Sequence, residues 1–235
     1  MNELLFFVTI IINFAGIVLA YKLFQKTGLF IWIAFATIIA NIEVLKSVNM
    51  FGLNVTLGNV IYGTIFLATD ALNELYGKKE ARKGVLVGFF SMTIFTALIT
   101  LSLLFVPSSQ DFANESMRTL FKFMPRILGA SMTAYLVSNL LDATLYDFIR
   151  GHSKDDKFLW LRNNGSTMLS QMLDTIVFTL IAFTGVFAFR TVLEIMLFTY
   201  IIKVIVAICD TPFLYLIRKI HKPNHQDKKQ ASEIA

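Results

Sequence analysis

The chain has 235 residues, of which 56% are hydrophobic and only 16% are charged, and its mean hydropathy is +0.65. Soluble domains are typically about 25% charged, so this composition argues against a soluble globular protein and for a membrane protein. The single cysteine excludes a disulfide framework, and the net charge of +5 requires no nucleic-acid partner, because membrane proteins concentrate lysine and arginine in their cytoplasmic loops.

Seven apolar runs are each long enough for a helix of about 20 residues, the length that crosses a bilayer. We therefore expect an all-α fold, a polytopic membrane helical bundle with about seven transmembrane helices in a single domain over residues 1–222. Residues 223–235 are polar and are expected to form a disordered cytoplasmic tail. The runs cover residues 4–24, 28–50, 55–76, 84–106, 125–149, 165–188 and 191–217.

The basic residues set the predicted orientation. The first lysine, Lys22, comes near the end of the first apolar run instead of preceding it, so the N-terminus does not resemble a signal peptide. The first run is expected to stay as a helix with its N-terminus on the outer side of the membrane. Most of the 21 basic residues then lie in inner segments such as 77–83 and 150–162. This positive-inside bias predicts a cytoplasmic C-terminus.

Residues 108–124 form the one long outer segment. Apolar side chains alternate there with basic ones, which predicts an amphipathic helix at the membrane interface; a lid over an outward-facing site is the alternative. Arg126, at the end of this pattern, is a candidate gate on the outer face. The pattern consists of apolar Phe112, Leu120, Phe121 and Met124 and basic Arg118, Lys122 and Arg126.

Four aspartates lie inside the apolar runs. A carboxylate at membrane depth costs about 2.5–3.5 kcal/mol on insertion scales, so such residues mark transport pathways or ion relays by default. At 1.5 Å rise per residue, each lies roughly 10–12 Å from the cytoplasmic edge. We expect them to form one polar layer if their helices surround a common cavity. They are Asp70, Asp142, Asp174 and Asp210.

Polar residues share helix faces with two of these aspartates. The spacing of three or four residues places each set on a single stripe, and Lys203, near the middle of the seventh run, is the evident countercharge for one carboxylate. The structural alternative is that such residues join helices by hydrogen bonds, and that Asp210, before Thr211-Pro212, caps a kink. The stripes are Ser131, Tyr135, Asn139 and Asp142 in the fifth run and Thr167, Gln171 and Asp174 in the sixth, with Asn41 in the second.

Three further patterns limit the function. No G-x-x-x-x-G-K-[ST] motif is present, so the chain is not expected to hydrolyse ATP by itself. The three histidines lie in loops or the tail, which leaves no intramembrane metal site. No serine or cysteine has a histidine partner at membrane depth, which argues against an intramembrane enzyme. We expect no cofactor.

Gly84 and Gly88 form a small-xxx-small pattern that predicts close helix packing.

Three segments resemble the signature of the queuosine precursor transporters, also called the vitamin uptake transporter-like family. They are FLATDALNELYGKKEAR at 66–82, Arg126 with Ala130-Ser131 and Tyr135, and LWLRNNGST at 159–167 leading to QMLDT at 171–175. The resemblance covers most of the chain. The run 4–24 looks like an added helix, because several members begin at what is here the second run.

The resemblance implies an importer in the inner membrane of a bacterium or archaeon. Its cargo would be a 7-deazaguanine (7-cyano-7-deazaguanine, the 7-aminomethyl compound or queuine), salvaged to make queuosine in tRNA. A substrate-binding subunit of an ATPase-energised vitamin or nucleobase uptake system is the alternative, and a structural scaffold is a third. The oligomeric state stays open, with a homodimer among the alternatives.

Residue chemistry suggests roles for the polar side chains in such an importer. A carboxylate can accept both N–H groups of a guanine-like edge, which suits Asp142 or Asp174. Asp70 is the predicted carrier of a coupled proton, because a buried carboxyl group favours its neutral form. The full set comprises Asp142, Asp174, Gln171, Asn139, Tyr135 and Asn41 for substrate binding and Asp70, Asp210 and Lys203 for proton or ion coupling.

Overall fold

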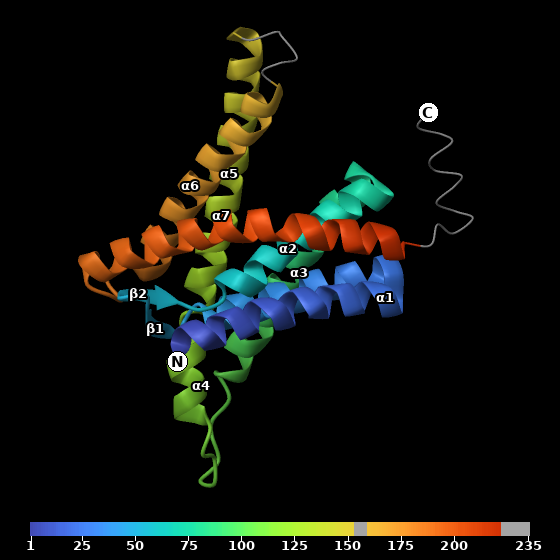
Figure 1. The fold of residues 1–235 in the computed structure, drawn as a ribbon. Coiled ribbons are helices and arrows are strands. Elements are labelled where there is room, and N and C mark those ends of the chain that lie inside the picture. The colour runs from blue at the N-terminus through green and yellow to red at the C-terminus, as the bar shows by residue number, and fades with distance from the viewer. Residues whose placement is uncertain (153–158, 222–235) are drawn as a thin grey trace. The chain divides into compact units, whose positions relative to one another are not determined.

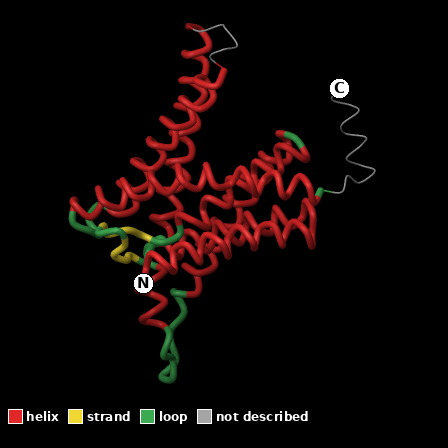
Figure 2. Tube along the Cα trace, viewed as in Figure 1, coloured by secondary structure: helices red, strands yellow, loops and turns green. Residues whose placement is uncertain are grey.

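The computed structural model describes the backbone of residues 1–152 and 159–221, and their side chains except those of 139, 142–152, 159–167 and 206–211. These residues form α-helices and one two-stranded β-hairpin (Figures 1 and 2). In chain order the elements are α1 (Asn2–Glu43), β1 (Ser47–Met50), β2 (Leu53–Thr56), α2 (Asn59–Tyr76), α3 (Lys78–Ser102), α4 (Asn114–Phe121), α5 (Met124–His152), α6 (Leu159–Phe183) and α7 (Phe189–Ile220).

The mainly helical membrane-type fold agrees with the sequence. Within the described residues, α1 and α3 are long and apolar enough to cross a bilayer, and Met168–Phe183 is a shorter apolar stretch. The chain divides into two compact units. Unit 1 comprises Met1–Val44, Leu57–Phe95 and Val204–Ala235, and unit 2 comprises Leu45–Thr56 and Thr96–Lys203. The single transmembrane domain stays a prediction, and the tail 223–235 lies outside the described residues.

In unit 1, α1 is two helical segments that meet at a sharp reversal. Gln25 breaks the helix with φ 52° and ψ −133°, within the gap predicted between the apolar runs 4–24 and 28–50. The segments pack so closely after the turn that a Cβ atom on Gly28 would lie 2.1 Å from the carbonyl oxygen of Ala20. Only glycine fits at such a backbone contact, which explains the residue found there.

The predicted helix over 28–50 is wrong at its C-terminal end. The helix ends at Glu43, and residues 47–56 form an antiparallel hairpin that pairs Val48 with Val55. Phe51 and Gly52 both have positive φ, at 53° and 77°, as a two-residue hairpin turn requires. The β-branched residues favour the strands. The next helix accordingly begins at Asn59, four residues later than predicted.

Glycines allow α3 to approach the rest of unit 1. A Cβ atom on Gly84 would lie 2.9 Å from side-chain atoms of both Ile33 and Leu72, and one on Gly88 would lie 3.1 Å from the Thr37 hydroxyl. The close packing predicted from the small-xxx-small pattern is therefore confirmed. Residues 78–83, predicted to be a connecting loop, are instead helical and follow a one-residue break at Gly77.

In unit 2, α5 and α6 run side by side in opposite directions (Figure 1). The Arg126 guanidinium group, near the start of α5, donates hydrogen bonds of 2.6 and 2.5 Å to the carbonyl oxygens of Ile181 and Thr184 at the end of α6. Ile181 lies in the last turn of α6, where helix carbonyls have no partner within the helix, and Thr184 directly follows its last residue, Phe183, so Arg126 caps the C-terminal end of α6. Of the predicted amphipathic segment 108–124, only Asn114–Phe121 is helical before α5 begins.

Candidate functional site

The candidate site is a buried ion pair between two helices of unit 2. Asp174 on α6 and Lys203 on α7 have side chains that are 12% and 10% exposed, and Lys203 Nζ lies 2.5 Å from Asp174 Oδ2. Lys203 was expected to neutralise one of the carboxylates, and the structure shows that this carboxylate is Asp174. Removing two charges from water is costly unless they pair closely, so this pair holds α6 and α7 together at one point.

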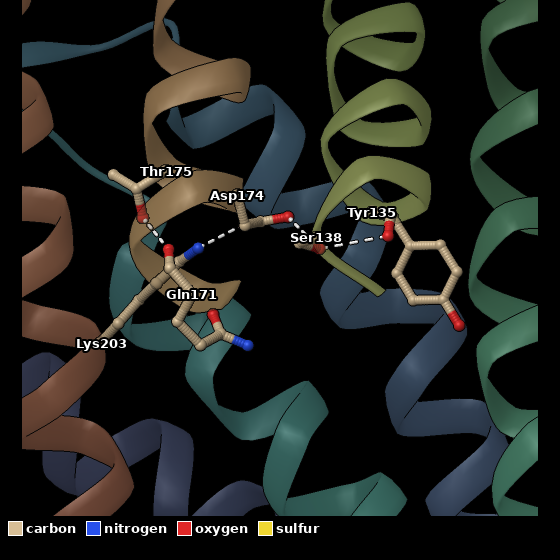
Figure 3. A network of polar contacts seen from close by, with 6 residues as sticks. All are labelled: Tyr135, Ser138, Gln171, Asp174, Thr175 and Lys203. Carbon is tan, nitrogen blue, oxygen red and sulfur yellow. Dashed lines mark hydrogen bonds and ion pairs between the residues drawn. The ribbon is translucent and has the colours of Figure 1, made fainter. Parts of the chain in front are cut away.

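A third helix reaches the same carboxylate. Ser138 on α5 lies 3.4 Å from Asp174 Oδ1 and 3.1 Å from the carbonyl oxygen of Tyr135. Figure 3 shows Lys203 approaching Asp174 from one side and Ser138 from the other. A serine hydroxyl has one proton to donate, so Ser138 can serve only one of these two acceptors at a time. Asp174 Oδ1 is therefore less firmly bound than Oδ2.

Polar residues continue along the same helix at intervals of four. The Thr175 hydroxyl donates a 2.9 Å hydrogen bond to the Gln171 carbonyl oxygen and is satisfied. Gln171 Oε1 and Thr179 Oγ1 are buried and have no hydrogen-bond partner within the described residues. A buried polar atom left without a partner costs about 1–3 kcal/mol, so an unpaired acceptor beside a carboxylate calls for an explanation.

A donor-rich ligand would supply the missing partners. A carboxylate has roughly four lone-pair sites; on Asp174, as far as the described side chains go, Lys203 and Ser138 occupy two of them. The remaining lone pairs and Gln171 Oε1 can accept hydrogen bonds, one turn apart on one face of α6. The arrangement is suited to binding a molecule that presents neighbouring N–H groups.

The predicted site residues divide between the two units. Tyr135 is in unit 2 and partly buried, but in Figure 3 its ring lies beyond Ser138, away from Asp174. Asn41 is in unit 1, buried, and donates a 2.7 Å hydrogen bond to the Thr37 carbonyl oxygen. Asp70, also in unit 1, has an exposed side chain on α2, although protein atoms surround much of its carboxyl group, so the burial expected of it is found only in part. The side chains of Asn139, Asp142 and Asp210 lie outside the described residues.

Sequence reasoning missed three polar residues that the structure places in or beside the site, namely Ser138, Thr175 and Thr179. A signal for two of them was present. Thr175 and Thr179 continue, at steps of four, the stripe that begins with Thr167 and Gln171. Ser138 could not be found by that rule, because its role depends on how α5 packs against α6.

Comparisons with known proteins identify the family. The family described as "Putative vitamin uptake transporter" matches residues 56–217. The "Probable queuosine precursor transporter" of Bacillus subtilis (strain 168) is 46% identical over 210 residues, which cover 89% of this chain and 92% of that protein. The "Queuosine precursor transporter" of Escherichia coli (strain K12) is 29% identical over 172 residues, 72% of this chain and 75% of its own length.

A third relative, the "Probable queuosine precursor transporter" of Haemophilus influenzae, is 36% identical over 140 residues, 59% of this chain and 56% of its own. No solved structure matches the chain. The family match includes α5, α6 and most of α7, and with them Ser138, Gln171, Asp174 and Lys203. On these grounds the chain belongs to the vitamin uptake transporter family, the family of the queuosine precursor transporters.

Proposed function

We propose that this chain imports queuosine precursors, the 7-deazaguanines, across a cytoplasmic membrane. The observation that carries the proposal is the 46% identity with a relative named as such a transporter, over 89% of this chain. The site supports it, because unsatisfied acceptors beside Asp174 suit the two neighbouring N–H donors of a guanine-like edge. Asp174 would accept the N1–H group, and Gln171 Oε1 would accept from the 2-amino group.

We further propose a multi-pass inner-membrane topology with seven spans. The spans would be the two segments of α1 together with α2, α3, α5, α6 and α7, with the N-terminus outside and the C-terminus in the cytoplasm. The positive-inside bias supports this orientation. Unit 1 contributes a basic cluster at the proposed inner end, where Glu80 pairs with Lys26 at 2.8 Å and with Lys83 at 2.6 Å.

The remaining predicted roles form part of the proposal. Asp70, exposed on α2, is accessible for a coupled proton. Arg126 caps α6, and a gate at this point would act by releasing that end of the helix. Asn41, already bonded to its own helix, would have to exchange that bond to contact a substrate, so it is a weaker candidate than Gln171.

Uptake of labelled 7-cyano-7-deazaguanine tests the function. Cells that cannot make the compound should accumulate label in tRNA when they express this chain, and not with an empty vector. Purified chain in liposomes should also transport the compound unaided, because a secondary transporter needs no separate ATPase. Uptake in cells without uptake in liposomes would favour the ATPase-energised alternative, and no uptake in either system would refute the proposal.

A further inference from the structure

The buried groups around Asp174 comprise one hydrogen-bond donor and two acceptors. The Lys203 ammonium group only donates, the Asp174 carboxylate only accepts, and the two lie 2.5 Å apart. Gln171, one turn earlier on α6, adds the buried acceptor Oε1, which has no partner within the described residues. We propose that Lys203 reads the 6-oxo group of the base and so makes the site specific for guanine-type over adenine-type 7-deazapurines.

The inference rests on the proposed function and adds a specificity-determining residue to it. A guanine-type edge presents O6, N1–H and the 2-amino group, which are acceptor, donor and donor. The adjacent pair O6 and N1–H is the complement of the adjacent pair Lys203 and Asp174, and Gln171 Oε1 adds an acceptor for the second donor. A lysine ammonium group has three N–H donors, so its bond with Asp174 is compatible with another to O6.

The hydrogen-bonding groups of an adenine-type edge do not match Lys203 and Asp174. Its 6-amino group would place N–H donors against the Lys203 ammonium group, and its N1 lone pair would face the Asp174 carboxylate. Both side chains are buried, at 10% and 12% exposure, so water cannot relieve either mismatch. A site built from buried polar groups rejects a ligand that leaves them unpaired far more strongly than an apolar pocket rejects a change of shape.

The competing explanation is that Lys203 only neutralises Asp174. Both explanations predict that removing the lysine harms transport, so loss of activity does not distinguish them. Only direct recognition of O6 by Lys203 predicts that its replacement changes how strongly guanine-type and adenine-type bases compete relative to each other. Lys203→Gln is the informative variant, because its amide can still donate to Asp174 and yet can present either its N–H₂ or its carbonyl oxygen to position 6 of the base. Lys203→Arg keeps a cationic donor.

The experiment measures competition for uptake of labelled 7-cyano-7-deazaguanine by the purified full chain in liposomes. The competitors are 7-deazaguanine and 2,6-diamino-7-deazapurine, which share the 2-amino group and differ at positions 6 and 1. For the unmodified chain we expect the diamino compound to compete about 10- to 100-fold more weakly. Lys203→Gln should reduce that ratio to about 3-fold or less, and Lys203→Arg should preserve most of it. Lys122→Gln, at an exposed lysine of unit 2, is the matched control and should leave it unchanged.

Several results would overturn the inference. An unmodified chain that transports 7-cyano-7-deazaguanine but does not discriminate between the two competitors refutes it without any variant. A Lys203→Gln protein that retains the full ratio also refutes it. So does one that stays monodisperse in detergent but binds no base, because Asp174 should still hold the donor edge. An unmodified chain that neither binds nor transports any 7-deazaguanine would instead refute the proposed function itself.

Discussion

Breaking the Asp174–Lys203 ion pair from one side should destabilise the protein strongly, whereas replacing both partners should not. Lys203→Met leaves the Asp174 carboxylate 12% exposed, and among the side chains that the structure describes its remaining polar contact is Ser138 at 3.4 Å. Removing one partner of a buried pair typically costs about 3–5 kcal/mol. The contact to Ser138 is long, so it compensates little, and we expect a loss of about 4 kcal/mol in the free energy of unfolding.

The double variant Asp174→Leu/Lys203→Met should restore most of that stability. Two apolar side chains of similar volume often match or exceed a buried ion pair, so the double variant should unfold within about 1 kcal/mol of the unmodified chain, or be more stable. Reversible unfolding by SDS in mixed micelles measures each free energy. The control is Arg190→Met, because Arg190 pairs with Glu194 at 3.2 Å but is 92% exposed, and exposed pairs contribute about 0–1 kcal/mol.

The same double variant separates stability from transport. It should be well folded and yet inactive in 7-deazaguanine uptake, since the acceptor of the donor edge is gone. A loss below about 1 kcal/mol for Lys203→Met would show that the pair is not desolvated as the structure has it. Normal uptake by the double variant would remove Asp174 from the substrate site.

Three further predictions concern packing and capping. Gly28→Ala should cost at least about 3 kcal/mol, by comparison with the tail of severe single substitutions, because its Cβ would lie 2.1 Å from a backbone oxygen; Gly129→Ala, with nothing within 4 Å of its Cβ, should be neutral or stabilising in the same SDS unfolding assay. Arg126→Gln should expose the end of α6 to faster amide hydrogen exchange while α2 is unchanged, and equal rates in both proteins would refute the capping role. Glu80→Gln should weaken the ion pairs of the buried Glu80 with Lys26 and Lys83, whose side chains are 35% and 54% exposed. Because water reaches both lysines, the unfolding free energy should fall by only about 1 kcal/mol, and a loss above about 3 kcal/mol would show that the pairs are far less screened than the exposure of the lysines suggests.

The sequence predicted the helices well because hydrophobic runs of bilayer length leave few alternatives. It failed where one apolar run contains two kinds of structure. Residues 28–50 read as a single helix, yet the turn at Phe51-Gly52 and the Val48–Val55 pair draw the end of the run into a hairpin. A pattern of period two in so short a segment is hard to separate from a helix by hydrophobicity alone.

The candidate site was predictable in its residue types but not in its pairing. Membrane-depth charges identified Asp174 and Lys203 separately, and their pairing follows only from how α6 and α7 pack. Gln171 was found as part of a stripe, but its unsatisfied Oε1 is a property of the packed structure. For Asp70, the place in an apolar run suggested burial, and its carboxyl group is partly surrounded by protein while its side chain keeps an exposed side.

The reversal at Gln25 bears on biogenesis. Only one residue leaves helical geometry there, and the Gly28–Ala20 approach clamps the two flanking segments against each other. With the proposed topology, a connection this short favours insertion of the two segments into the membrane together, as one helical hairpin. An epitope tag inserted at the turn should separate the two segments of α1, whereas the same tag placed ahead of Asn2 should leave their packing unchanged.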